Sequence, residues 1–262
     1  MSNSNTNPLT GIEALVFDVF GTVVDWRNTV AREIKEVGRR VGVEVSEDDC
    51  YAFADEWRQG YIYNTRRIAE GGEGPKEVDV MHRQILDTML SSSRWSQSGL
   101  GSSLDEGMKK DLNLIWHRLD GWPDSSQGLK SLKEHVIIVT LSNGNVRLLV
   151  DMAKHAKLPW DTIFSTALFD SYKPNPITYQ SALSHLSLSS TPSKAAMVAA
   201  HIHDLRAAAK VGMKTIFVKR ETEDSVEVRE SVRAKSEGGE VDVVVDNLEE
   251  LAGLFAARDG RV

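Results

Sequence analysis

A short apolar run that ends in a carboxylate constrains this chain more than any other feature of its sequence. Residues 14–17 are Ala-Leu-Val-Phe, Asp18 follows them, and Phe20 and Gly21 then turn the chain before the hydroxyl of Thr22. Such a run, bounded by a turn, predicts a buried strand of a parallel sheet. Functional groups of open α/β sheets lie at the carboxyl ends of strands, which makes Asp18 a candidate. Taken alone, Asp18 is also explained as a cap or turn residue.

The segment after this strand carries a helical pattern up to residue 119. Apolar side chains recur there at intervals of three and four residues, with charged residues between them. The polar stretches at 70–75 and 91–103 interrupt the pattern and are predicted to be loops. The expected helices cover residues 28–40, 47–62, 78–89 and 104–119.

Strands alternate with helices in the remainder of the chain. This alternation predicts an α/β fold, a doubly wound and mostly parallel sheet with helices on both faces. Since only helices separate the first strand from the others, the simplest architecture is a Rossmann-like core of residues 1–26 and 125–262 with an all-helical cap domain, residues 27–124, inserted into it. The charged stretch 221–240 is predicted to be mostly a solvated loop. The further strands are expected at 136–141, 162–168, 195–200, 214–218 and 241–245.

Composition excludes several classes of partner and location. The net charge is −7 and the pI about 5.6, whereas nucleic acids and anionic membranes require a basic face. No apolar run approaches the ~18 residues of a membrane span. Cys50 is the only cysteine, so no intramolecular disulfide forms, which is typical of a reducing compartment and favours the cytoplasm. Residues 1–10 are rich in Ser and Asn, unlike a secretory signal, and are expected to form a loose tail.

Polar side chains follow four of the predicted strands and loops. Carboxyl ends of neighbouring parallel strands meet at one edge of a sheet, so these side chains are predicted to converge on one crevice. Each has a simpler explanation by itself, because Ser, Asn and Asp cap helices and most lysines are solvated. The candidates are Asp18 and Thr22, Ser142 and Asn143, Lys173, and His201 and Asp204.

At this point the chain resembles the haloacid dehalogenase superfamily, whose four motifs occur in order. They correspond here to Asp18-Val19-Phe20-Gly21-Thr22, Leu141-Ser142-Asn143-Gly144, Lys173-Pro174 and Asp204. The resemblance covers nearly the whole chain, including the helical cap. It implies the α/β core predicted above and Asp18 as a nucleophile.

Two positions distinguish between the branches of this superfamily. Phosphatases have a second Asp where this chain has Phe20, and an acidic metal ligand where it has Ala200. Only Asp18 and Asp204 then remain as oxygen ligands, too few for a Mg²⁺ site. An aromatic residue at the Phe20 position resembles the 2-haloacid dehalogenase branch, which uses no metal. We therefore expect neither a metal nor another cofactor.

The resemblance implies hydrolytic dehalogenation of short (S)-2-haloacids to 2-hydroxyacids, through an aspartyl ester and with inversion at C2. Asp18 would attack C2, Lys173 would keep it ionised, and Thr22 would orient it. Arg58 and Asn143 would receive the halide. The simpler explanation for Arg58 is a solvated helix arginine, and for Tyr179 it is packing. The other expected contacts to substrate come from Val19, Phe20, Ser142, Tyr179 and His203.

The last motif departs from the pattern of this branch, which has Ser-Ser-Asn before an aromatic residue and the Asp. Here Ala199 and His201 replace the Ser and Asn that place the catalytic groups and the water, and His203 replaces the aromatic residue. Either His201 acts as a hydrogen-bond partner or general base in ester hydrolysis, or it only bonds Asp204 or a carbonyl group. How water is activated therefore stays open at this level.

Two other functions remain as alternatives. One is a phosphate-ester hydrolase of the same fold, and the other is a catalytically idle binding protein, which the changes at Ala199 and His201 favour. The expected partner is a small-molecule 2-haloacid, with no nucleic acid and no membrane. Because relatives are commonly dimers, a homodimer is also considered.

Overall fold

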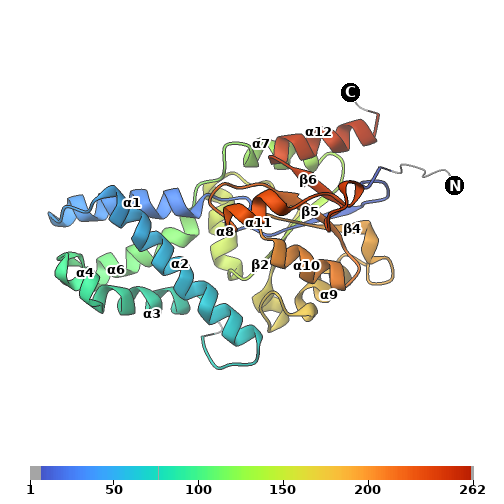
Figure 1. The fold of residues 1–262 in the computed structure, drawn as a ribbon. Helices are drawn as coiled ribbons and strands as arrows, with labels where there is room; N and C mark the ends of the chain where they lie inside the picture. Colours follow the sequence, from blue (N-terminus) through green and yellow to red (C-terminus); the bar gives the residue numbers. More distant parts are fainter. Residues whose placement is uncertain (1–6, 76, 261–262) are drawn as a thin grey trace.

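A six-stranded parallel sheet forms the centre of the computed structural model, which describes residues 7–75 and 77–260 (Figure 1). In the described chain the strand order is β3-β2-β1-β4-β5-β6, and every pairing is parallel. The strand that ends before Asp18 therefore lies in the middle, where both of its edges are paired. The strands are β1 (Ala14–Phe17), β2 (Ile137–Ser142), β3 (Thr162–Ser165), β4 (Ala195–Ala199), β5 (Lys214–Val218) and β6 (Val243–Val245).

Helices cover both faces of the sheet, which confirms the doubly wound α/β fold. Side chains of β1 alternate between two hydrophobic clusters, with Leu15 and Phe17 in one and Ala14 and Val16 in the other. The first cluster includes α7 (Ser125–Leu132), α8 (Val146–His155) and α12 (Leu248–Arg258). The second includes α9 (Pro176–His185) and α10 (Ile202–Lys210), with α11 (Val226–Ser231) packed beside them.

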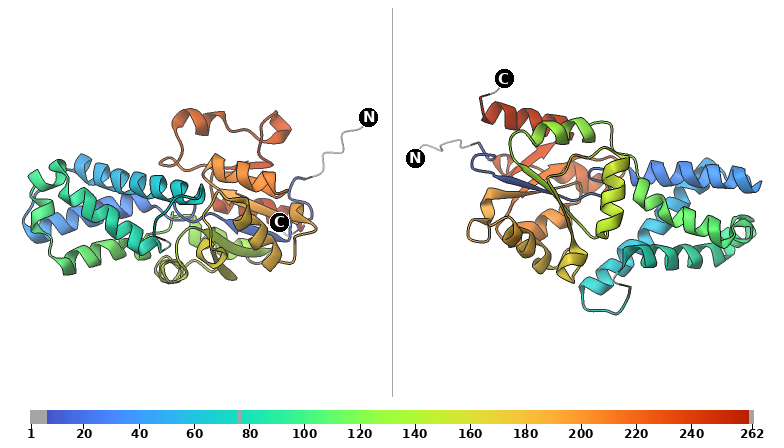
Figure 2. Two further views of the ribbon diagram at one scale, coloured as in Figure 1. Left: turned by 90° about the horizontal axis from the view of Figure 1, so that it is seen from below. Right: turned by 180° about the vertical axis from the view of Figure 1, so that it is seen from behind.

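The helical segment lies beside the sheet and projects away from it in every view (Figures 1 and 2). The predicted loop at 91–103 is wrong. Two short helices occupy it, and they form because Trp95 and Leu100 are buried against neighbouring helices. The domain boundaries themselves stay a prediction. The elements of this segment are α1 (Trp26–Val41), α2 (Glu47–Ala69), α3 (Val78–Ser91), α4 (Ser93–Gln97), α5 (Leu100–Ser103), α6 (Glu106–Asn113) and the 3₁₀ helix η1 (Leu114–Arg118).

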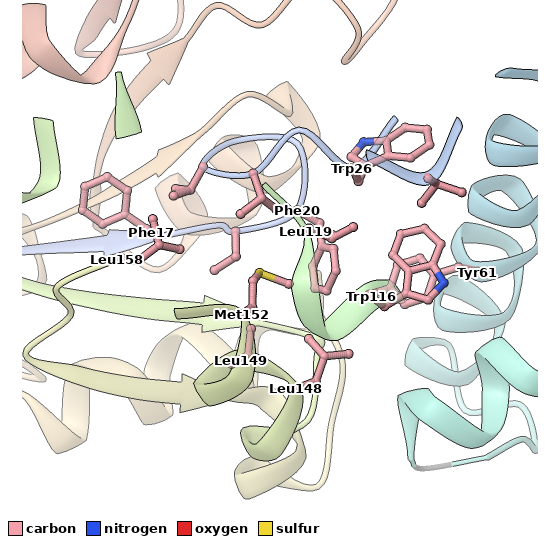
Figure 3. Close-up of a cluster of buried hydrophobic side chains, with 14 of the residues drawn as sticks. Phe17, Phe20, Trp26, Tyr61, Trp116, Leu119, Leu148, Leu149, Met152 and Leu158 are labelled. Carbon is pink, nitrogen blue, oxygen red and sulfur yellow. The ribbon is translucent and has the colours of Figure 1, made fainter. Parts of the chain in front are cut away.

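Aromatic side chains join the helical segment to the sheet next to Asp18 (Figure 3). The Trp116 ring stacks on Trp26 at a centroid distance of 6.4 Å and lies 6.2 Å from the ring of Phe20. The Phe20 ring in turn lies 6.3 Å from that of Tyr61 on α2. Apolar packing thus holds α2 over the carboxyl end of β1.

The loose tail predicted for residues 1–10 is only partly described by the structure. Residues 1–6 of the expected loose tail lie outside the described residues. Within the described part the expectation is wrong at Leu9, which is buried in the hydrophobic core. Among the described helices, none has the length and apolar character needed to cross a bilayer.

Candidate active site

A cavity of about 100 Å³ lies between α2 and the carboxyl ends of the strands. Asp18 directly follows β1, Ser142 ends β2, and His201 lies between β4 and α10. The fold therefore brings together side chains that are far apart in the sequence. Of the predicted site residues, ten line this cavity: Asp18, Phe20, Arg58, Ser142, Asn143, Lys173, Tyr179, His201, His203 and Asp204.

The Lys173 ammonium group lies between two buried carboxylates. Its Nζ donates to Asp18 Oδ1 at 2.8 Å and also to Asp204 Oδ2, while the Tyr179 hydroxyl donates to Asp204 Oδ1. Burial lowers the pKa of Lys173, but the charges of both carboxylates outweigh burial and raise it above its usual value. Burial raises the pKa of Asp18, but Lys173 and His201 bring it well below its ordinary range. Asp18 is therefore an ionised carboxylate, the state that a nucleophile requires.

Thr22 does not line the cavity, but it orients Asp18. The Thr22 hydroxyl oxygen accepts the N–H of Ala200 at 2.9 Å, so its own proton points to Asp18 Oδ2 at 2.8 Å. Val19, the other predicted residue outside the lining, is buried in the hydrophobic core.

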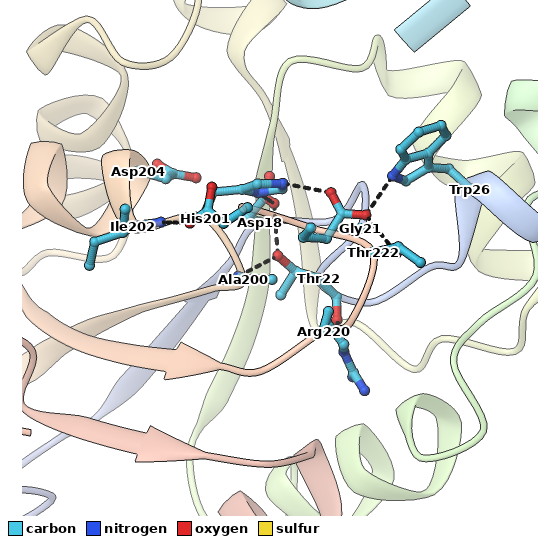
Figure 4. A network of polar contacts seen from close by, with 12 residues as sticks. Asp18, Gly21, Thr22, Trp26, Ala200, His201, Ile202, Asp204, Arg220 and Thr222 are labelled. Atoms are coloured by element: carbon cyan, nitrogen blue, oxygen red, sulfur yellow. Dashed lines mark hydrogen bonds and ion pairs between the residues drawn. The ribbon is translucent and has the colours of Figure 1, made fainter. Parts of the chain in front are cut away.

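Glu223 is a member of the site that local sequence patterns did not reveal, and its carboxylate joins His201 to Trp26, both labelled in Figure 4. The prediction of a mostly solvated loop at 221–240 is wrong here, because Glu223 is 4% exposed. Its Oε2 accepts from His201 Nε2 at 2.8 Å and its Oε1 accepts from Trp26 Nε1 at 2.7 Å. Nothing in the local sequence distinguishes Glu223 from the exposed Glu221 nearby.

His201 therefore bridges two carboxylates. Its Nδ1 lies 3.0 Å from Asp18 Oδ2, and its Nε2 contacts Glu223. Ionised carboxylates only accept hydrogen bonds, so both ring nitrogens must donate and the ring is an imidazolium. Burial lowers the pKa of His201, but hydrogen bonds and charges of Asp18 and Glu223 outweigh it and raise the pKa to about 10. The contact with Asp204 or a carbonyl group, one of the two alternatives above, is not what the structure shows.

Arg58 is a buried cation without an anionic partner. It is 8% exposed and makes no hydrogen bond or ion pair with any described residue. Its guanidinium lies over the rings of Phe20, Trp26 and Tyr61, at 5.7, 5.4 and 5.1 Å from their centroids. The simpler explanation, a solvated helix arginine, is therefore wrong. Because a buried unpaired charge is costly, an anion bound beside this guanidinium would be stabilising.

Asn143 holds the lysine segment in place. Its Oδ1 accepts the backbone N–H of Lys173 at 2.8 Å and the hydroxyl of Thr166 at 3.1 Å. Ser142 Oγ accepts the N–H of Gly144 at 3.3 Å, which leaves its hydroxyl proton available. His203 lies at the rim of the cavity, where partial removal of its ring from water and the charge of His201 lower its pKa, so it is neutral.

The two positions at which phosphatases of this superfamily carry an acid are occupied by Phe20 and Ala200. Phe20 contributes an aromatic wall, and Ala200 contributes its backbone N–H to Thr22. Within residues 7–75 and 77–260 no group of three or more His, Cys, Asp or Glu side chains is arranged to hold a metal ion. That the reaction needs no metal stays a prediction.

Gly21 is predicted to be required because Glu223 lies against it. Its φ is +81°, and an added Cβ would lie 2.2 Å from Glu223 Cδ. Gly42 has a similar φ of +71° but open space around it. Gly42→Ala should cost about 1–2 kcal/mol of unfolding free energy, the cost of the left-handed conformation, and Gly21→Ala should cost more. Urea unfolding of both variants measures this, and equal losses would contradict the steric argument.

The fold and this site match those of known proteins. A family model for haloacid dehalogenase-like hydrolases matches residues 12–212. The (S)-2-haloacid dehalogenase 4A of Burkholderia cepacia is 28% identical over 216 residues, 80% of this chain and 84% of that protein. The crystal structure of an L-2-haloacid dehalogenase is 34% identical with a TM-score of 0.80, over 94% of this chain and 99% of that one. The crystal structure of a defluorinating L-2-haloacid dehalogenase is 36% identical with a TM-score of 0.79, over 95% of this chain and 98% of that one.

The matched region contains Asp18, its Lys173 partner and Asp204. These comparisons and the arrangement of the site lead to one conclusion: the chain belongs to the haloacid dehalogenase-like hydrolase family, on the branch of the L-2-haloacid dehalogenases.

Proposed function

We propose that this protein hydrolyses short (S)-2-haloacids to 2-hydroxyacids. The observation that carries the proposal is the buried, unpaired guanidinium of Arg58 in the same cavity as the ionised Asp18. A nucleophile and an anion acceptor in one small cavity suit displacement of a halide. The names of the relatives support the substrate class, since they are (S)-2-haloacid or L-2-haloacid dehalogenases.

In the first step, an oxygen of Asp18 forms a bond to C2 of the substrate. The carbon–halogen bond breaks, and the halide leaves with the electron pair toward Arg58 and Asn143. Attack from the side opposite the halide inverts C2. Lys173 keeps Asp18 ionised, and Asp204, held by Tyr179, keeps Lys173 in place.

The substrate carboxylate is proposed to bind Ser142 and the backbone N–H groups of Val19 and Phe20. Ser142 Oγ has a proton to donate, because the contact with Gly144 uses only its acceptor capacity. Phe20, Tyr179 and His203 would form the remaining walls. A cytoplasmic location and a homodimer stay predictions.

Absence of an acid at position 20 argues against the phosphate-ester alternative. A departing alkoxide needs a proton, whereas a departing halide does not. Phe20 cannot supply a proton, and the carboxyl groups in the site are ionised partners of Lys173 and His201. Strong Mg²⁺-dependent release of phosphate from a simple ester would nevertheless overturn the proposal.

The test is a single turnover of excess enzyme with (S)-2-chloropropionate in ¹⁸O-water. We expect chloride, (R)-lactate and one ¹⁸O atom in the peptide that contains Asp18, because water attacks the carbonyl carbon of the ester. Product formation without label in Asp18 would exclude the ester route. Absence of both chloride and product would favour a binding protein.

Arg58→Met is expected to lower kcat/KM for 2-chloropropionate by about 100-fold or more, because the halide loses the buried guanidinium that receives it. The same change should leave the apo protein as stable or more stable, since a buried unpaired charge is removed. Arg67→Met, an exposed position on the same helix α2, is the matched control and should be near wild type. Steady-state chloride release and urea unfolding measure the two effects, and unchanged kcat/KM would contradict the halide role.

A further inference from the structure

We infer that His201 and Thr22 form the oxyanion hole for hydrolysis of the ester on Asp18, with His201 acting as a cationic donor that Glu223 positions. This inference rests on the proposed function and concerns its second half. It replaces the general-base role that the sequence left open for His201.

The two oxygens of Asp18 have different surroundings. Oδ2 accepts from Thr22 Oγ1 at 2.8 Å and from His201 Nδ1 at 3.0 Å, whereas Oδ1 accepts from Lys173 Nζ. Oδ1 is thus the less engaged oxygen and the one that attacks C2. Oδ2 then becomes the carbonyl oxygen of the ester, with two donors already aimed at it.

The ester is cleaved by water with both of these donors in place. The water oxygen bonds to Cγ of Asp18, and the electron pair of the carbonyl bond moves onto Oδ2, where Thr22 and His201 receive the negative charge. The bond between Cγ and Oδ1 then breaks and the carbonyl bond re-forms. One water proton ends on the product hydroxyl, which keeps Oδ1, and the other goes to solvent as the carboxylate is restored.

Direction and charge of these donors are set by contacts outside the cavity. The N–H of Ala200 occupies the acceptor side of Thr22, so its hydroxyl proton must face Oδ2. Glu223 accepts from Nε2 of His201 and is itself held by Trp26 Nε1. When Asp18 becomes a neutral ester, Glu223 remains as the anion beside His201 and keeps the ring protonated.

The other acids nearby, Asp204 and Asp224, contact Lys173 and the backbone N–H of Ile202 rather than the His201 ring. The ring of His203, on α10, lies 5.6 Å from that of His201 and is neutral. Lys173 is on the far oxygen of Asp18, and Arg58 lies near enough to Glu223 to lower its pKa. Glu223 is therefore the residue that controls the charge of His201 during ester hydrolysis.

The pH dependence separates a cationic donor from a general base, because the two require opposite protonation states. Single-turnover reactions with 2-chloropropionate are quenched and the ester-bearing protein is quantified by mass spectrometry. As a donor, His201 gives an ester-hydrolysis rate that falls on the alkaline side. As a base, it would give a rate that falls on the acid side, and that result would overturn the inference.

The pH above which the ester-hydrolysis rate falls is expected to be roughly 1–3 units lower in Glu223→Gln, because the opposite charge beside His201 is lost. Glu223→Asp keeps the charge, so its ester-hydrolysis rate should fall at the same pH as that of the wild type. Lys173 does not contact Glu223, so its titration should not respond to Glu223→Gln. An ester-hydrolysis rate that falls at the wild-type pH in this variant would mean that a group other than His201 titrates, and would overturn the inference. His155→Asn removes a surface His–Asp pair away from the cavity and is the matched control, with no shift expected.

Substitution of His201 supplies a second test, which does not depend on the fold of the Glu223 variants. His201→Ala should still release one equivalent of chloride but hydrolyse the ester about 10²–10³-fold more slowly, as for loss of one oxyanion donor. His201→Asn keeps a neutral donor and should fall between Ala and wild type. An equal loss of ester-hydrolysis rate in both variants would indicate that His201 acts as a general base. Absence of chloride release from the wild-type enzyme would instead contradict the proposed function, and the inference with it.

Discussion

Replacing Lys173 by methionine is expected to abolish chloride release at neutral pH and to lower the free energy of unfolding by about 3–5 kcal/mol. The side chain is 9% exposed and is the cation between the carboxylates of Asp18 and Asp204. Its removal leaves two like charges buried close together, so one of them must take up a proton. Asp18 then loses the partner that contributes most to lowering its pKa.

The sign of the pH effect follows from that shift. In the wild type the pKa of Asp18 is below its usual value, so the paired carboxylate stabilises the fold above its unfolded pKa and that stability is lost as the pH falls. In Lys173→Met the pKa of Asp18 rises, so any residual chloride release should increase from neutral to alkaline pH. Urea unfolding and chloride assays across pH measure both effects.

Lys219→Met is the matched control for this experiment. Lys219 pairs with Asp246 on the surface, where both side chains are at least half exposed. Exposed ion pairs contribute only about 0–1 kcal/mol. A stability loss in Lys173→Met no larger than in this control would contradict the account of a buried charge cluster.

Asp18→Asn is expected to reduce chloride release by about 10⁴-fold or more, because the amide oxygen is a far weaker nucleophile than a carboxylate oxygen. No mass increase from a covalent ester should appear on this variant. An amide has a single oxygen, so either Lys173 or the pair of Thr22 and His201 loses its acceptor. The walls of the cavity and Arg58 are unchanged, so binding of the unreactive substrate should survive in a calorimetric titration.

Asp246→Asn, on the exposed surface, is the corresponding control and should react like the wild type. Chloride release by Asp18→Asn within tenfold of the wild type would mean that water attacks C2 directly. That outcome would exclude both the covalent ester and the oxyanion role of His201.

Local sequence signals were sufficient for the sheet and for most of the lining of the cavity. Strand β1 is apolar on both faces and ends at Asp18, and the later strands end in polar groups that parallel pairing brings to one edge. The prediction was wrong where packing overrides composition. The polar stretch at 91–103 forms helices because a few apolar residues such as Trp95 are buried, and a short window does not reveal their partners.

By itself, the sequence determined the fold class, the position of Asp18 at the end of a central strand and the absence of an acid at Phe20, because each depends on residue types at the strand ends. Only the tertiary structure decided the charge of His201 and the isolation of Arg58. Both properties depend on what lies within a few ångströms: Glu223 comes from a charged loop distant in the sequence, and aromatic rings rather than a carboxylate lie against the guanidinium of Arg58. Electrostatic environment is a property of neighbours in space, which residue order alone does not specify.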